Sequence, residues 1–249
     1  MMSTRTVNKR VEVAQLLEST ILSGLLKPGT HLPEIRLGRE LGVSQAIIRE
    51  ALQDLESLGL VVKQPNRGTD VVELSLDDLV AIYQVRRELE PLACGLAALH
   101  RTQKDIQELE SCVAQMRSAA ANHDFSSYSS ADVRFHRKIW SAQPNRYLVK
   151  SLETVCLPLF AYDQIGRSAT SSIDYERVTR QHEVILVALR TGNSELSSSL
   201  MRRLMPRWLR IHIEDFQRIL QFSSDQTPDL TEVYAHLRAS LNSRPNFNR

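Results

Sequence analysis

The chain has 249 residues, of which 42% are hydrophobic and 24% charged, a composition typical of a folded protein and not of a disordered one. Its formal net charge of +2 is too small to indicate a nucleic-acid ligand, so any such prediction depends on where the charges lie. No apolar run approaches the roughly 18 residues of a membrane span, and the N-terminal residues lack a signal-peptide core, so we expect a cytoplasmic protein with no membrane partner.

The N-terminal part of the chain follows the order helix, helix, tight turn, helix, β-hairpin. Apolar spacing predicts three helices and two short strands: Val11–Ser23, Glu34–Leu41, Gln45–Leu58, Leu60–Val62 and Thr69–Val72. Gly42 suits a helix end because it tolerates positive φ, and Ser44 can cap the third helix. This order predicts a winged helix-turn-helix in residues 1–74, with the third helix presented to a DNA major groove.

From Ser75 onward the pattern is helical. Ser75 and Asp78 form a capping-box signature at the start of the next helix. The predicted helices are Leu76–His100, Thr102–Asn122, Ser126–Ala142, Asn145–Ile165, Ile173–Thr191 and Ser194–Phe222. We therefore expect a mainly α protein with an all-α bundle in residues 75–222. Residues 223–249 are expected to hold one helix, at Leu230–Leu241, and a polar tail.

Four stretches of residues 1–74 match the pattern of a known family. They are Lys27–Gly29, Leu41–Ser44, Ile48–Leu52 and Pro65–Gly68. In this order and spacing they resemble the GntR family of bacterial transcription regulators. The resemblance implies a DNA-binding protein that is not an enzyme.

The second part of the chain resembles the effector-binding, all-helical FCD domain of the FadR subfamily. The matching stretches are Arg86–Pro91, Leu96–Ala98, Asp132–His136, Gln181–His182, Ala188–Leu189 and Gly192–Asn193. The resemblance implies a homodimer that binds a palindromic operator and releases or alters it when a small carboxylate-type metabolite binds.

The resemblance also implies a set of DNA contacts. They are Arg36, Ser44, Gln45, Ala46, Arg49, Arg67 and Gly68. Arg49 is the expected base or phosphate contact, although an Arg49 paired with Glu50 or Asp54 on a solvated face remains open. Arg36 and Arg67 have the same alternative of a solvated side chain.

Gln45 departs from the family pattern, which commonly has Arg directly after Val-Ser. In the major groove Gln favours adenine where Arg favours guanine, so the operator of typical relatives cannot be assumed. Gln45 could instead only cap or solvate the start of the helix.

Asp132 and His136 are four residues apart, so they share one helix face and could hold one metal ion. The resemblance adds His182 as a ligand and places the fourth ligand, a His, near Leu204; His212 comes eight residues later. Three ligands plus water or an effector carboxylate could hold Zn²⁺ or Ni²⁺. A metal-free polar pair and direct effector binding by these residues are the alternatives.

Arg86 and Arg134 are the expected clamps for an effector carboxylate, because guanidinium binds carboxylate through two parallel hydrogen bonds. A structural Arg86–Glu90 pair, four residues apart, competes with this role for Arg86. A metal-dependent enzyme using the Asp132, His136 and His182 cluster with Glu183 as a base is the alternative function. It leaves the winged helix without a purpose.

Three cysteines, Cys94, Cys112 and Cys156, are odd in number and have no Cys-x-x-Cys spacing. This pattern suits a reducing compartment and argues against both a disulfide framework and a cysteine zinc site. We expect three buried thiols.

Overall fold

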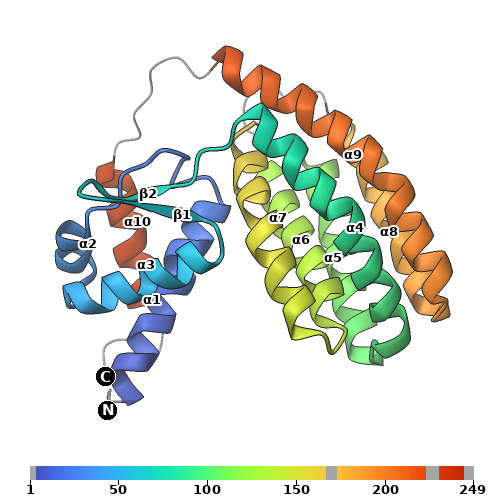
Figure 1. Ribbon diagram of the computed structural model, residues 1–249, viewed down its shortest axis with the longest axis horizontal. Helices are drawn as coiled ribbons and strands as arrows, with labels where there is room; N and C mark the ends of the chain where they lie inside the picture. Colours follow the sequence, from blue (N-terminus) through green and yellow to red (C-terminus); the bar gives the residue numbers. More distant parts are fainter. Residues whose placement is uncertain (1–3, 167–172, 223–229, 244–249) are drawn as a thin grey trace. The chain divides into compact units, whose positions relative to one another are not determined.

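The computed structural model describes residues 4–166, 173–222 and 230–243 (Figure 1). The chain divides into two compact units, one formed by Met1–Glu73 with Asp225–Arg249 and the other by Leu74–Ser224. Among the described helices, none combines the length and the apolarity needed to cross a membrane.

The first unit is a winged helix-turn-helix with one added helix. Its elements are α1 (Thr4–Leu22), α2 (Glu34–Leu41), α3 (Gln45–Ser57), β1 (Val61–Gln64), β2 (Gly68–Val71) and α10 (Leu230–Asn242). Gly42 ends α2 in the left-handed conformation with φ 64°, and the Ser44 hydroxyl accepts a hydrogen bond from the Ile47 amide to cap α3. The apolar faces of α1 and α2 pack on α3, and the predicted fold of this part is confirmed.

The wing is an antiparallel hairpin in which Val61 pairs with Val71 and Gln64 pairs with Gly68. Gly68 has φ 100°, and a Cβ there would lie 2.7 Å from Cε1 of His31. The backbone at the base of the wing therefore requires glycine.

Helix α10 packs against α1 and α2, although more than 150 residues separate it from them in the sequence. Val233, Tyr234, Leu237 and Leu241 are buried. The guanidinium of Arg36 lies 4.6 Å from the centre of the Tyr234 ring, and Arg238 of α10 pairs with Glu40 of α2. The sequence predicted a helix here, but not that it completes the core of the first unit.

Leu237→Ala should destabilise the first unit by about 2–5 kcal/mol, because Leu237 is fully buried and its truncation leaves a cavity. The unfolding transition of this unit, followed by hydrogen exchange of α1 and α2, measures the effect. His236→Ala, an exposed neighbour on the same helix, should change it by less than about 0.5 kcal/mol. Equal effects of the two variants would contradict the packing of α10.

The second unit is an all-α bundle. Its helices are α4 (Leu76–His100), α5 (Gln103–Ala121), α6 (Phe125–Ser141), α7 (Arg146–Gly166), α8 (Tyr175–Thr191) and α9 (Ser194–Phe222). Helix α4 packs against α9 and α7, while α5 packs against α6 and α8 (Figure 1). The residues described in this unit form no strand, and the expected mainly α class is confirmed.

The start of α1 differs from the prediction. Helix α1 begins at Thr4 and not at Val11. The sequence predicted the later start because the first residues of the helix have no apolar period. Arg10 instead binds Asp54 of α3 through two hydrogen bonds of 2.8 and 2.7 Å. The predicted helices that run through Pro91, Pro158 and Pro206 are present, although proline inside a helix commonly breaks or kinks it.

Candidate functional site

The N-terminal end of α3 presents Ser44, Gln45, Ala46 and Arg49 on the surface. Glu34, the first residue of α2, accepts hydrogen bonds from Gln45 Nε2 at 2.8 Å and from Arg49 Nη2 at 2.9 Å. The hydrogen bond from Arg49 holds the pKa of Glu34 below its usual range. Arg49 therefore pairs with Glu34, and neither of the partners suggested by the sequence, Glu50 or Asp54, holds it.

The remaining predicted DNA contacts lie in the same unit. Arg67 is exposed at the wing, between Asn66 with φ 61° and Gly68. Arg36 is exposed on α2, and its guanidinium lies over the Tyr234 ring. Local sequence patterns do not show that Glu34 binds both Gln45 and Arg49, because that contact depends on how α2 crosses α3.

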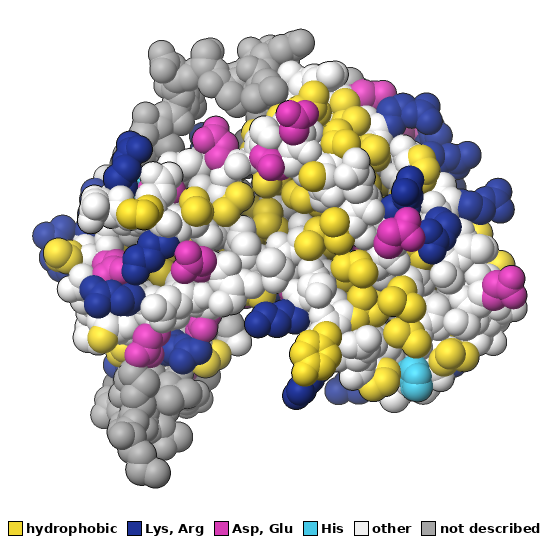
Figure 2. Space-filling model, viewed as in Figure 1, with side chains coloured by type: hydrophobic (Ala, Val, Ile, Leu, Met, Phe, Trp, Pro, Cys, Tyr) yellow, Lys and Arg dark blue, Asp and Glu magenta, His cyan; other side chains and the backbone are white. Residues whose placement is uncertain are grey.

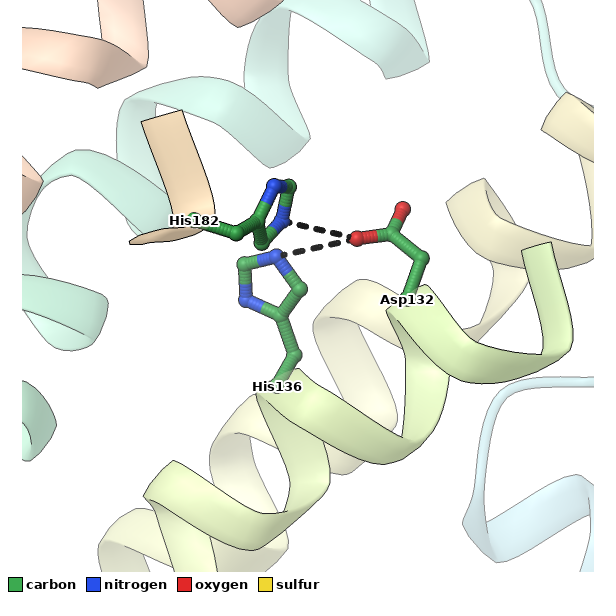
Figure 3. Close-up of side chains that lie close together, drawn as sticks. All are labelled: Asp132, His136 and His182. Atoms are coloured by element: carbon green, nitrogen blue, oxygen red, sulfur yellow. Dashed lines mark ion pairs between the residues drawn. The ribbon is translucent and has the colours of Figure 1, made fainter. Parts of the chain in front are cut away.

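A second constellation is buried in the bundle. Asp132 and His136 come from α6 and His182 comes from α8, and all three side chains converge (Figure 3). Asp132 Oδ1 lies 2.9 Å from His182 Nε2 and 3.7 Å from His136 Nε2. One donor atom from each residue lies within 4.8 Å of the others. The structure thus brings together all three predicted metal ligands.

The hydrogen bonds of the two Nδ1 atoms fix the orientation of both histidine rings. His182 Nδ1 lies 2.9 Å from the Val178 carbonyl oxygen, which can only accept, so Nδ1 donates its proton there. His136 Nδ1 likewise donates to Glu90 Oε2 at 2.9 Å. Nε2 of each ring therefore faces the Asp132 carboxylate, and His182 Nε2 makes no hydrogen bond to the residues that the structure describes. Metal-bound histidines are oriented in this way, with one ring nitrogen donating to a carbonyl or carboxylate and the other facing the ion.

Behind His136 lies a buried ion pair. Arg86 donates from Nε to Glu90 Oε1 at 2.7 Å, and Arg86 is 1% exposed while Glu90 is fully buried. Burial alone would raise the pKa of Glu90, but the charges of Arg86 and His136 lower it to about 2. The Arg86–Glu90 ion pair that the sequence suggested is therefore present. Arg86 Nη1 makes no hydrogen bond to a described residue and is therefore a spare donor.

The Asp132, His136 and His182 cluster opens on a cavity of about 20 Å³, enough for one ion or one water molecule. Arg86, Trp208 and His212 also line it. The Nδ1 atom of His212 is 2.6 Å from the Tyr83 hydroxyl, so His212 does not join the three ligand atoms.

Two further predicted positions lie away from this cavity. Leu204, where the family pattern has its fourth ligand, lines a separate groove between α8 and α9. Arg134 is exposed on the opposite side of α6 from Asp132, with hydrogen bonds to Ser130 and Gln115. Arg134 is therefore not placed to share an effector with the cluster.

The three cysteines are free and buried, as expected. Burial raises the pKa of the Cys94 and Cys156 thiols. Both thiols are therefore protonated at neutral pH.

Comparison with known proteins gives two matching family models: "Bacterial regulatory proteins, gntR family" over residues 9–71 and "FCD domain" over residues 81–207. The chain is 29% identical over 75% of its length to a probable D-xylose utilization operon transcriptional repressor of Paenarthrobacter nicotinovorans, covering 80% of it. It is 31% identical over 55% of its length to the HTH-type transcriptional regulator YieP of Escherichia coli, covering 68% of that protein.

Among solved structures, Escherichia coli McbR/YncC matches with a TM-score of 0.70 at 22% identity. The match covers 86% of this chain and all of McbR/YncC, and at this identity it supports the fold alone. The family assignment rests instead on the two models, which together span both units. The chain belongs to the GntR family and carries an FCD domain, and it is a DNA-binding transcription regulator and not a metal-dependent enzyme.

Proposed function

We propose that this regulator binds a palindromic operator as a homodimer and that a small carboxylate-type metabolite, bound in the α4–α9 bundle, releases or alters the complex. The observation that carries the proposal is the buried Asp132, His136 and His182 cluster, placed beside the unused Nη1 donor of Arg86. A regulator of this kind acts in the cytoplasm, where its DNA lies.

The proposed DNA contacts are the seven residues given by the sequence: Arg36, Ser44, Gln45, Ala46, Arg49, Arg67 and Gly68. Arg49 and Gln45 now bind Glu34, so each must exchange that carboxylate for a base edge or a phosphate on binding DNA. Glu34 thereby keeps both side chains extended beside the N-terminus of α3, which lowers the entropy lost when they meet a base.

Selection of binding sites from random DNA tests the proposed function directly. The wild-type protein should select an inverted repeat, and a Gln45→Arg variant should change an A·T preference in each half-site to G·C. Recovery of no consensus sequence would contradict operator binding. The same consensus from both proteins would show that Gln45 does not read a base.

We further propose that Asp132, His136 and His182 hold one divalent ion, Zn²⁺ or Ni²⁺. The donor set of one carboxylate and two imidazoles suits either ion, and the two Nδ1 hydrogen bonds fix the rings for it. A bound ion supplies a Lewis-acidic centre for a carboxylate. Arg86 can bind the same carboxylate through Nη1, and the small cavity must widen to admit it.

Purified protein should contain about one divalent ion per chain, and His182→Ala should remove it, as measured by elemental analysis. Because an ion bound only by the folded state stabilises that state, chelation should lower the melting temperature of the wild type. His236→Ala, an exposed histidine on α10, is the matched control and should keep the ion. Purified protein that contains no metal, and whose melting temperature does not change on addition of Zn²⁺ or Ni²⁺, would contradict this assignment.

An apolar stripe on α4 supports a homodimer. Val85, Leu92 and Leu99 recur every seven residues and are 42%, 48% and 58% exposed, so they lie along one side of the helix. Hydrophobic side chains run along α4 on the face drawn in Figure 2. Water-exposed stripes of this kind commonly mark contacts between chains, and a second copy of this stripe is complementary to it.

Leu92→Asp should therefore shift the protein toward a monomer of about 28 kDa in light scattering at micromolar concentration. Val187→Asp, at an exposed valine on α8, is the control and should leave the dimer intact. A monomeric wild type, or equal dissociation by both variants, would contradict a dimer through α4.

A further inference from the structure

A groove between α8 and α9 is lined by arginines. Its walls are Arg177 and Arg180 from α8 and Arg203 and Arg207 from α9, and its volume is about 350 Å³. An adjoining hollow of about 340 Å³ shares Arg177 and Arg207 and adds Arg210. Lys and Arg side chains gather along α9 in Figure 2. The two hollows form one basic groove of the size that small ligands occupy.

Most of these guanidinium groups have no partner among the residues that the structure describes. Arg180 pairs with Glu176 at 3.4 Å, but the side chains of Arg177, Arg203, Arg207 and Arg210 make no hydrogen bond or ion pair in the structure. Every other arginine of α4–α9 whose side chain is described has a partner, as in Arg190 with Glu110 and Arg202 with Glu88. Among the described arginines of the bundle, those without a partner thus lie together at one groove, where their charges repel one another in the absence of an anion.

The spacing of the arginines indicates what the groove can hold. Arg203, Arg207 and Arg210 stand about one turn apart on one face of α9, so the first and the last are separated by roughly 10 Å along the axis. One carboxylate cannot reach all of them, whereas two separate anionic groups can. Glu214 lies beyond Arg210 and repels an anion toward the Arg177, Arg203 and Arg207 end.

We propose that this groove binds a small molecule with two or more phosphate or carboxylate groups, at a site separate from the buried cluster. The guanidinium groups bind the anionic groups, and the apolar side chains of Val184, Leu200 and Leu204 contact the carbon frame between them.

The floor of the groove also contacts the buried cluster. Gln181, a buried residue of the groove, accepts a hydrogen bond from Trp208 Nε1 at 2.6 Å. The Trp208 ring stacks on His182, with ring centres 5.3 Å apart and an angle of 17°. An anion that displaces Gln181 therefore changes the surroundings of Trp208. Because Trp208 stacks on His182, the effect extends to His182 through one intervening side chain.

Calorimetric titration of the full chain tests the proposal, with fructose 1,6-bisphosphate as the phosphate probe and tricarballylate as the carboxylate probe. At least one of them should bind saturably, at one molecule per chain, and change tryptophan fluorescence, while acetate at equal ionic strength does neither. Arg203→Gln/Arg207→Gln should weaken that binding at least tenfold. The matched control, Arg117→Gln/Arg190→Gln, removes the same charge from exposed, paired arginines and should change it less than twofold.

Three results would overturn the proposal. The first is the absence of saturable binding by both probes. The second is an equal loss in both double variants, which would show a general effect of net charge. The third is that only a DNA duplex binds and that the groove double variant weakens it, which would make the groove a contact for the DNA backbone.

Discussion

Arg49→Ala should lower the affinity for the selected operator by about 30-fold or more. A bidentate contact between arginine and guanine contributes about 1–3 kcal/mol, and a dimer loses it in both half-sites. The Arg49 side chain is exposed at the start of α3, where it pairs with Glu34. Fluorescence anisotropy at fixed salt, with operator and scrambled duplexes, measures specific and non-specific binding separately.

The control for Arg49 is Arg39→Ala, which removes one exposed charge from α2 without touching α3. It should weaken binding to both duplexes slightly and equally, since it acts only through net charge. Circular dichroism should show unchanged helix content in both variants. If Arg49→Ala binds the operator as well as wild type, α3 does not read DNA through this residue.

Glu90→Ala should destabilise the α4–α9 bundle by about 3–5 kcal/mol, because it leaves Arg86 as an uncompensated charge in the interior. It also removes the acceptor of His136 Nδ1, so the ring is free to turn and metal content should fall. Denaturant unfolding measures the first effect and elemental analysis the second. If Glu90→Ala does not fold, Glu90→Gln keeps the shape of the side chain and shows the same trend.

A double variant separates the loss of the pair from the loss of packing. Arg86→Met/Glu90→Leu removes both charges and should recover much of the stability lost in Glu90→Ala, since apolar replacements of buried ion pairs are often neutral. Glu110→Ala, which breaks the exposed pair with Arg190, should cost less than about 1 kcal/mol. A Glu90→Ala protein as stable as Glu110→Ala would show that the Arg86–Glu90 pair does not stabilise the bundle.

Much of the fold was predictable because its signals are local. The Ser75–Asp78 capping box begins α4 at the predicted residue, and Gly192 in the left-handed conformation ends α8 as predicted. Asp132 and His136 of the cluster were also predictable, since a spacing of four residues places them on one helix face. His182 was predicted only from the resemblance to the FCD domain.

Features that depend on contacts between distant helices were not predictable. Nothing near Gln45 or Arg49 in the sequence indicates that Glu34 binds both, because the crossing of α2 and α3 creates that contact. In the same way, the arginine groove needs two helices, and neither Arg177 nor Arg203 marks it alone. A spacing of four residues suggested the Arg86–Glu90 pair, but only the fold shows that Glu90 also holds His136.

The packing of α10 on α1 and α2 also has a consequence for synthesis. A ribosome makes the chain from the N-terminus, so the helices of the bundle leave it before α10 does. Until then the apolar surface of α1 and α2 that Leu237 covers stays open to water. The winged helix-turn-helix therefore reaches its full stability only after the whole α4–α9 bundle has been translated. A chain that stops before α10 lacks part of the core of its first unit.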